Sequence, residues 1–354
     1  MSKNYILALN GLRFYLFLLI LATHYKYIIK VSYIGEKLYP LLNQGHFAVL
    51  FFFVLSGFCI ALGYHEKFDT LNKSEIFAFI KKRIFKIYPL YIITGLIMLL
   101  LYYLPQKIAW LYAFIFLYVP MLAPYTPFPD GGGNGAGWFL SALFLCYILT
   151  PFIIKFIKKR NLLICLFLTY LCIIFLALIP VFIPQLQQYS AFIYKFPPIR
   201  VFHYSIGLIV GMMYASNSYK LQNNDIIEKH PYLIEVLVLL SIFIIMFGFR
   251  HGDISNPILG MPIILITIIY LCNVKNGLLY KLFTNKISQY LGSISFECYM
   301  IHYPLCTFLK TKIQPYCYSI SGIIVFYFVL LFITIILSVI YNKFFTKILF
   351  KTKQ

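Results

Sequence analysis

The sequence ILALNGLRFYLFLLILATHYKY, residues 6–27, is an apolar run long enough to cross a membrane, and the ionisable residues Arg13 and His24 lie inside it. An ionisable side chain at membrane depth costs roughly 3 kcal/mol on insertion scales, so such residues normally face a protein interior or an aqueous cavity. Eleven residues of α-helix turn through about 1100° and rise about 16 Å, so both side chains project from one face. The run therefore predicts a helix whose charged face points toward a polar part of the protein. A structural role within a helix bundle and a role in chemistry or ligand binding both fit this pattern.

The composition of the chain is that of a polytopic helical membrane protein. The 354 residues are 62% hydrophobic, the mean hydropathy is +0.85, and apolar runs of about 20 residues, the length of a membrane-spanning helix, recur along the chain. The short alternating segments of a membrane β-barrel are not found. The first run lacks a small-residue cleavage site, which favours a retained span over a signal peptide. We expect an all-α fold in a single integral-membrane domain, residues 1–354, without an appended soluble domain.

The hydrophobic runs predict ten spans, and one further apolar stretch, residues 108–123, is ambiguous. Because Lys and Arg concentrate in cytoplasmic loops, the basic residues at 81–86 and 158–160 should share that side, with an even number of crossings between them. The stretch 108–123 should then be re-entrant or interfacial on the outer side, although eleven spans remain the alternative. Both termini fall on the cytoplasmic side of the cell membrane, whereas Lys310 and Lys312 fall outside as a misfit. The ten expected spans are 6–28, 44–64, 87–104, 137–157, 162–184, 199–216, 232–250, 257–273, 288–309 and 319–341.

The formal charge of +20 mostly reflects this topology, since lysine is the usual flank of membrane helices at anionic lipid headgroups. The residues outside the expected spans leave no basic soluble domain that could bind nucleic acid. Eight cysteines are scattered, mostly within apolar runs, without a CxxC pair or a His/Cys cluster of ligand-like spacing. They are typical of small core residues, and we expect neither a disulfide framework nor a metal site.

Two motifs flank the junction between the second and third spans. In FFFVLSGF, residues 51–58, Ser56 precedes a glycine, which favours close helix packing over a nucleophilic serine because no GxSxG motif accompanies it. In FIKKRIFKIYPLY, residues 79–91, basic residues alternate with apolar ones. This run predicts either an interfacial turn held at lipid phosphates or a cytoplasmic anion site. In the second case Arg83 and Lys86, one helical turn apart, would grip the phosphates of a donor.

The loop PYTPFPDGGGNGAG, residues 124–137, contains too many prolines and glycines to hold a helix. We expect a flexible outer loop, and the alternative is a lid over an external substrate groove. The loop leads into the motif GWFLS, residues 137–141. Trp138 in this motif is typical of an interfacial aromatic residue, with a pocket wall as the alternative.

The ninth span contains the sequence SFECYMIHYP, with Glu297, Tyr299 and His302. Glu297 and His302 are about 140° apart around the helix, so they should not pair with each other. A buried glutamate needs a partner from another helix. Arg13 is the expected partner, and Arg200 is the alternative.

These motifs, in this order, resemble acyltransferase family 3, whose members are multi-pass membrane enzymes that O-acylate sugars of surface polysaccharides and other acceptors. The resemblance implies about ten spans, a cytoplasmic acyl-CoA donor, and Arg13 and His24 as essential residues. The chain departs from the family pattern at Lys86, where arginine is usual, at Leu50, where an acidic or small polar residue is usual, and in lacking a Ser-x-Glu ending after Trp138. The motifs that carry the resemblance are Arg13-x10-His24, FFVLSGF at 52–58, KKRIFKIYPLY at 81–91, Trp138-Phe-Leu-Ser, the span with Gly207–Gly211, and ISFECYMIHYP.

The resemblance implies transfer of an acyl group, with acetyl preferred, from acyl-CoA to a hydroxyl of a cell-surface glycan or its lipid-linked precursor. Such a transfer needs a base near the hydroxyl and a donor held in line. His24 is the natural base, because histidine has an unperturbed pKa near neutrality. Arg13, nearer the cytoplasm, would bind the donor or neutralise Glu297, so that the two residues mark the ends of one channel. The other residues expected at the site are Arg83, Lys86 and Lys82 for the donor, and Glu297, Tyr299, His302, Trp138, Ser141 and Ser56 as supporting or acceptor-side groups.

Two other classes of function also fit the sequence. A transporter or flippase for polysaccharide or lipid-linked sugar could use the intramembrane charges to bind substrate or protons, and a catalytically inactive subunit could serve a glycan-assembly complex. We expect acyl-CoA as the donor substrate and no permanently bound cofactor. The expected partners are acyl-CoA, the sugar acceptor and membrane lipids, with glycan-assembly proteins as further candidates and no nucleic acid.

Overall fold

The computed structural model describes residues 6–29, 33–222, 225–248 and 252–351. The chain is 84% helical and the described residues contain no strand, which confirms the all-α prediction. The helices are α1 Leu7–Ile29, α2 Tyr33–Leu42, α3 Gly45–Tyr64, α4 Lys73–Met98, α5 Ala109–Ala113, α6 Trp138–Lys158, α7 Leu162–Phe182, α8 Ser190–Lys195, α9 Pro197–Ala215, α10 Asp225–Lys229, α11 Pro231–Gly248, α12 Gly252–Asn273, α13 Leu278–Thr284, α14 Lys286–Ser293, α15 Ser295–Ile313 and α16 Ile320–Lys351. The π-helical turns Leu99–Tyr103 and Phe114–Tyr118 extend α4 and α5, and short 3-10 turns occupy Ala123–Tyr125, Pro184–Tyr189, Ser218–Lys220 and Gln314–Tyr316.

Six of the described helices are long and apolar enough to cross a membrane, namely α1, α3, α4 with its extension, α6, α7 and α16. The pair α12 and α13, bent by 77°, would make a seventh if it forms one span. The expected spans 199–216, 232–250 and 288–309 correspond to α9, α11 and α15, which fall short of the same test, and residues 249 and 250 lie outside the described residues. The last of these spans begins later than expected, at Ser295, because the separate helix α14 precedes it. The total of ten spans therefore stays a prediction.

The ambiguous stretch 108–123 forms a short apolar helix, Ala109–Tyr118. Ten helical residues rise about 15 Å, half of the roughly 30 Å hydrocarbon core, so this length agrees with the expectation that the stretch does not cross. Its far end folds back on α4, where the ring of Tyr118 stacks on Tyr91 with 4.2 Å between ring centres. The Tyr91 hydroxyl donates to the Tyr118 carbonyl oxygen at 2.8 Å, and the Tyr118 hydroxyl donates to the Tyr91 carbonyl oxygen at 3.0 Å.

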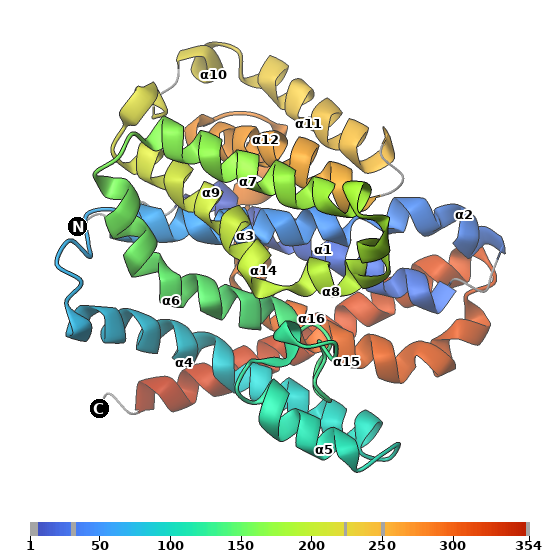
Figure 1. The fold of residues 1–354 in the computed structure, drawn as a ribbon. Coiled ribbons are helices and arrows are strands. Elements are labelled where there is room, and N and C mark those ends of the chain that lie inside the picture. Colours follow the sequence, from blue (N-terminus) through green and yellow to red (C-terminus); the bar gives the residue numbers. More distant parts are fainter. Residues whose placement is uncertain (1–5, 30–32, 223–224, 249–251, 352–354) are drawn as a thin grey trace.

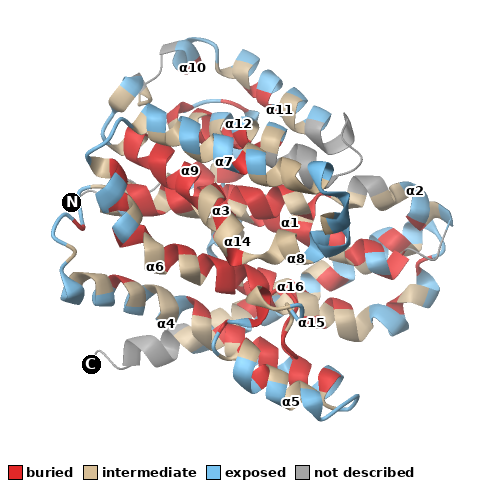
Figure 2. Cartoon of the chain, viewed as in Figure 1, coloured by how far each residue is buried: buried red, intermediate tan, exposed pale blue. Residues whose placement is uncertain are grey.

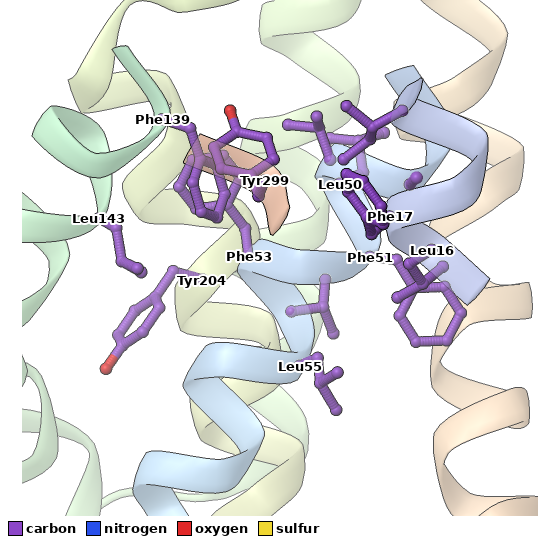
Figure 3. Packing of buried hydrophobic residues seen from close by; sticks show 14 of the residues in the cluster. Leu16, Phe17, Leu50, Phe51, Phe53, Leu55, Phe139, Leu143, Tyr204 and Tyr299 are labelled. Carbon is purple, nitrogen blue, oxygen red and sulfur yellow. The ribbon is translucent and has the colours of Figure 1, made fainter. Parts of the chain in front are cut away.

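The close crossing of α3 and α9 organises the core. Figure 1 shows α1 and α3 in the middle of the bundle, with α11 and α12 on one side and α4 and α16 on the other. A Cβ atom at Gly57 would overlap the carbonyl oxygen of Tyr204, and one at Gly207 would overlap that of Val54. Small residues at these positions let the two backbones touch, as the sequence predicts for the Ser-Gly pair of α3. Figure 3 shows the large apolar side chains that α3 presents around this crossing.

The C-terminal helices α13, α14 and α15 pack against α1 and determine what lies beside its charged face. The Asn10 side chain donates a hydrogen bond to the carbonyl oxygen of Gln289 on α14 at 2.9 Å. The Tyr15 hydroxyl lies 3.0 Å from the Ser288 hydroxyl on the same helix. These bonds hold α14 against the first half of α1, and α15, which follows α14, continues alongside α1 toward His24.

The outer helices present apolar side chains outward, as expected for helices in contact with lipid. Only Ile173 of α7 is buried, whereas Phe167 is 60% exposed and Phe175 is 67% exposed. In Figure 2 the buried residues gather on the central helices, and α7 and α11 carry exposed ones. This exposure of apolar side chains is the reverse of the pattern in a soluble protein. It agrees with a membrane helix bundle, in which the polar groups form their hydrogen bonds inside the protein.

The α3–α9 crossing predicts opposite effects of alanine at two glycines of α3. Gly57→Ala should lower the melting temperature by several degrees, because its Cβ atom meets backbone of α9 that cannot move independently. Gly63→Ala is the matched control, since nothing lies within 4 Å of its Cβ position, and it should gain about 0.5–1 kcal/mol from helix propensity. Thermal unfolding of the two purified variants measures the difference, and equal melting temperatures would contradict the close crossing.

Candidate active site

The charged face of α1 points into the protein, where two cavities receive its side chains. Arg13 lines a cavity of about 220 Å³, called here the Arg13 cavity. His24 lines a cavity of about 850 Å³, called here the His24 cavity. Because the two residues lie about 16 Å apart along one helix, the cavities lie toward opposite ends of α1. This placement agrees with the expected orientation of the charged face, although it gives two cavities rather than one continuous channel.

Basic residues from α1 and α4 meet at the Arg13 cavity. Arg83 and Lys86 line it from α4, and Ser56 lines it from α3. The Nη2 atom of Arg13 lies 3.5 Å from the Sγ atom of Cys59 on α3. The guanidinium of Arg83 lies within 6.0 Å of three aromatic ring centres, a favourable position for a cation. None of the described residues that line this cavity is acidic, so the cavity is strongly cationic.

Four residues expected at the site line neither cavity, namely Lys82, Ser141, Glu297 and His302. Lys82 is exposed on α4, one residue before Arg83. Ser141 is buried in α6, with its hydroxyl 3.5 Å from the carbonyl oxygen of Gly137 in the preceding turn. Lys82 therefore lies at the surface beside Arg83. Ser141 lies in the buried interior, where it packs between helices.

Glu297 is bound by an amide rather than by an arginine. Its Oε1 atom accepts a hydrogen bond from Nδ2 of Asn342 on α16 at 2.9 Å, and its Oε2 atom, also buried, has no hydrogen-bond partner. Arg200, the alternative partner, donates from Nε to the carbonyl oxygen of Tyr194 at 2.7 Å, and none of the described ion pairs joins Glu297 to Arg13. The expectation of a partner on another helix is confirmed, but its expected identity was wrong. Asn342 lies 45 residues further along the chain, where helical spacing gives no indication of contact.

His24 packs against two aromatic residues of α15. Its ring centre lies 5.1 Å from that of His302 and 5.1 Å from that of Tyr303. His302 is fully buried behind His24. Both of its ring nitrogens are buried, and neither has a hydrogen-bond partner among the described residues. The arrangement presents the His24 ring to the cavity and limits its rotation, because His302 and Tyr303 pack against it.

The glycine-rich part of this segment, residues 131–137, forms a buried plug and not the flexible loop that we expected, whereas Pro127 and Phe128 before it are exposed. Residues 131–137 are all buried. Asn134 donates a hydrogen bond to the carbonyl oxygen of Met300 at 2.8 Å and accepts one from the amide of Ala136 at 3.0 Å. The Tyr299 hydroxyl donates to the carbonyl oxygen of Ala136 at 2.9 Å. The glycines allow this backbone to pass between α4, α6 and α15, and Gly135 and Ala136 line the His24 cavity, which is closer to the lid alternative.

Tyr299 forms part of the wall of both cavities. Its ring centre lies 5.3 Å from that of Phe139, which in turn lies 4.7 Å from that of Phe53; Figure 3 shows these three rings together. Trp138 lines the His24 cavity and packs on Tyr194 with 5.1 Å between ring centres. For this buried tryptophan the pocket-wall interpretation is right and the interfacial one was wrong.

The His24 cavity also contains charged residues that the sequence did not assign to a site. The Nζ atom of Lys195 lies 3.0 Å from Oδ1 of Asp130, which joins the end of α8 to the buried plug. One indication of these residues was present in the sequence. In the expected topology Lys310 falls on the outer side, although the positive-inside rule predicts lysines on the cytoplasmic side. The unassigned acidic, basic and histidine residues in the wall are Lys26, His46, Asp130, Lys195 and Lys310. Within the described part of the chain, no group of three His, Cys, Asp or Glu side chains could hold a metal ion.

The buried plug predicts a large cost for removing its central amide. Asn134→Ala leaves the Met300 carbonyl and the Ala136 amide without their partners, which should destabilise the protein by about 1–3 kcal/mol. Thr126→Ala in the same segment is the matched control. It removes a hydroxyl that is only half-buried and bonds within its own turn, so its effect should be smaller. Thermal unfolding of both variants measures this, and an Asn134→Ala protein as stable as the control would contradict the plug.

Comparison with known proteins identifies a family for the chain. A family model described as an acyltransferase domain matches residues 6–343, which is nearly the whole chain. No curated protein and no solved structure matches the chain. The match includes both cavities and every helix that lines them, and it covers the motifs on which the sequence resemblance rests. The chain is a multi-pass membrane protein that belongs to acyltransferase family 3.

Proposed function

We propose that this membrane acyltransferase transfers an acyl group, with acetyl preferred, from cytoplasmic acyl-CoA to a hydroxyl of a cell-surface glycan or of its lipid-linked precursor. The observation that carries the proposal is the division of the charged face of α1 between two cavities that share Tyr299 as a wall. A donor held in one cavity and an acceptor held in the other would meet along a single helix. The proposal places the protein in the cell membrane, with the Arg13 end and both termini on the cytoplasmic side.

The Arg13 cavity suits the donor because CoA carries phosphates and the cavity wall carries cations. Arg13, Arg83 and Lys86 converge there without an acidic neighbour in the described wall. Arginine binds phosphate in a bidentate manner, whereas lysine acts as a point charge. The small cavity would hold the acyl-bearing arm of the donor, and the exposed Lys82 beside it would contact the nucleotide at the surface.

The His24 cavity suits the acceptor because it is larger and has aromatic walls. In the proposed reaction His24 takes the proton of the acceptor hydroxyl while the hydroxyl oxygen attacks the thioester carbonyl carbon. The new C–O bond forms, the C–S bond breaks, and CoA leaves as a thiolate that takes up a proton. His302 and Tyr303 would hold the His24 ring during this step. Direct transfer and a transient acyl-enzyme are both compatible with this arrangement.

The thioester must pass Tyr299 to reach His24. The Tyr299 ring is packed on Phe139 and its hydroxyl is bonded to the buried plug, so a rotation of this side chain would join the two cavities. Keeping the ring closed without an acceptor would keep water away from the thioester. This role follows from the position of Tyr299 between the cavities and needs no other moving part.

A transporter or flippase remains the second candidate, and the same position of Tyr299 favours it. Two cavities at opposite ends of one helix, divided by an aromatic ring, are also what alternating access requires. Purified protein with radiolabelled acyl-CoA distinguishes the two, because only the enzyme consumes thioester in the presence of an acceptor. Flipping of a lipid-linked sugar without thioester consumption would support the transporter.

The proposed base predicts a loss of turnover in His24→Ala. General base catalysis contributes about 10²–10⁴-fold, so acyl transfer should fall by at least 100-fold while binding of acyl-CoA persists. His65→Ala, a histidine at the end of α3 that lines neither cavity, is the control and should retain activity. Glycan mass spectrometry of cells and acyl transfer by purified protein measure the effect. Full acylation by a well-folded His24→Ala protein would end the proposal.

The proposed donor site predicts that Lys86 sets the affinity for acyl-CoA. Lys86→Gln should raise the KM for acyl-CoA about tenfold, Lys86→Arg should lower it because the guanidinium binds phosphate in two places, and Lys82→Gln should change it less. Cys59 gives a readout without turnover, because it lies beside Arg13 in the same cavity. Acyl-CoA should slow maleimide labelling of Cys59, followed by peptide mass spectrometry. Unchanged labelling together with an unchanged KM would contradict this donor site.

A further inference from the structure

The wall of the His24 cavity carries more positive than negative charge. Lys26 of α1, Lys195 at the end of α8 and Lys310 of α15 all line it, and Asp130 is the single acidic residue among the described residues of the wall. Lys26 and Lys195 lie close enough to His24 to act on it electrostatically. A cavity with walls of low polarity focuses the field of such charges and concentrates ligands of the opposite sign.

Topology does not account for these lysines. Lysines that follow the positive-inside rule gather at the cytoplasmic ends of helices, whereas Lys310 falls at the opposite end of α15 from the basic turn of α4. Lys195 points toward the plug and is paired with Asp130, with a side chain only 23% exposed. Lys26 is 2% exposed, donates a hydrogen bond to Asn43 and lies between the rings of Tyr27 and Tyr39. The three lysines thus line the cavity from three different helices, with Lys26 and Lys195 held by named partners and Lys310 exposed.

Aromatic rings form the rest of the wall. Trp138, Tyr194 and Tyr303 line the cavity beside His24, and Arg200 fixes Tyr194 through the Tyr194 carbonyl. Flat aromatic faces pack well against the C–H faces of sugar rings because both are apolar. The volume of about 850 Å³ is within the range of roughly 300–1,000 Å³ for sites that hold small ligands.

We propose that the acceptor bound in the His24 cavity is anionic: a glycan with a carboxylate or phosphate group close to the hydroxyl that is acylated, gripped by Lys195 and Lys310. This inference rests on the proposed function for the reaction itself and adds the substrate class. The anionic group binds at the lysines while the aromatic walls hold the sugar rings, so a neighbouring hydroxyl faces His24. Lys195 exchanges its bond with Asp130 for one with the acceptor, or bridges the two.

The binding test uses purified protein in zwitterionic nanodiscs without acyl-CoA, so that no turnover occurs. The ligands are a uronate-containing tetrasaccharide and the same tetrasaccharide after reduction of its carboxyl groups to alcohols. Calorimetry should show at least tenfold tighter binding of the uronate form at low salt, and the difference should shrink as salt rises because it is electrostatic. A neutral tetrasaccharide with a diphosphate at its reducing end distinguishes a sugar carboxylate from the phosphate of a lipid carrier as the anionic group.

Variants of the cavity wall test the assignment to individual lysines. Lys195→Gln and Lys310→Gln should each weaken binding of the anionic ligand about tenfold and leave the neutral ligand unchanged. Lys312→Gln is the matched control, since Lys312 is exposed on the same helix and does not line the cavity. Asp130→Asn separates the two roles of Lys195. If Lys195 binds the acceptor, Asp130→Asn retains or tightens anion binding; if Lys195 only holds the plug, Asp130→Asn weakens binding as Lys195→Gln does.

Several results would overturn the inference. Equal affinity for the charged and reduced tetrasaccharides would do so, as would an Asp130→Asn variant that mimics Lys195→Gln. An effect of the lysine variants that appears only in nanodiscs of anionic lipid would show that the lysines bind headgroups. Absence of acyl transfer from added acyl-CoA, with the preference for the anionic glycan intact, would instead reject the proposed function and leave an anionic-glycan binding site.

Discussion

An arginine and a histidine on one face of an apolar helix constrain the helices around them, because neither side chain is stable against hydrocarbon. α1 meets this constraint by turning Arg13 and His24 into the protein. Each then needs a polar environment of its own, since about 16 Å of helix separates them. The basic turn of α4 and the aromatic residues of α15 provide the walls. The two cavities are the consequence of placing both residues on one helix.

Backbone contacts keep these cavities in place. Gly57 and Gly207 allow α3 and α9 to touch, and α3 contributes Ser56 and Cys59 to the cavity that Arg13 lines. At the other end the buried plug takes the place of helix, and Asn134 satisfies backbone groups that would otherwise be orphaned. Irregular backbone at this depth is stable only where protein covers it. The glycines of the plug provide that fit because they leave room for the rings of α4 and α15.

The walls of both cavities carry more positive than negative charge. Both walls carry basic residues from elements distant in sequence, and the few acidic residues nearby are held by specific partners, Glu297 by Asn342 and Asp130 by Lys195. Anionic molecules would therefore be favoured in both cavities. An acyl-CoA donor and an anionic acceptor on opposite sides of Tyr299 fit this excess of positive charge. The field of the basic side chains would attract such molecules toward the cavities.

The amino-acid sequence alone determined the helical membrane class, the common face of Arg13 and His24, the close packing at Ser56 and the proximity of Arg83 to Lys86. These features depend on hydrophobic periodicity and on spacing within one helix, which are local. Tertiary structure alone decided that Asn342 binds Glu297, that His302 lies behind His24, that the segment before Trp138 is buried, and that Lys195 pairs with Asp130. Each of these contacts joins segments far apart in the chain. Local spacing carries no information about them, because the path of the intervening helices decides which side chains meet.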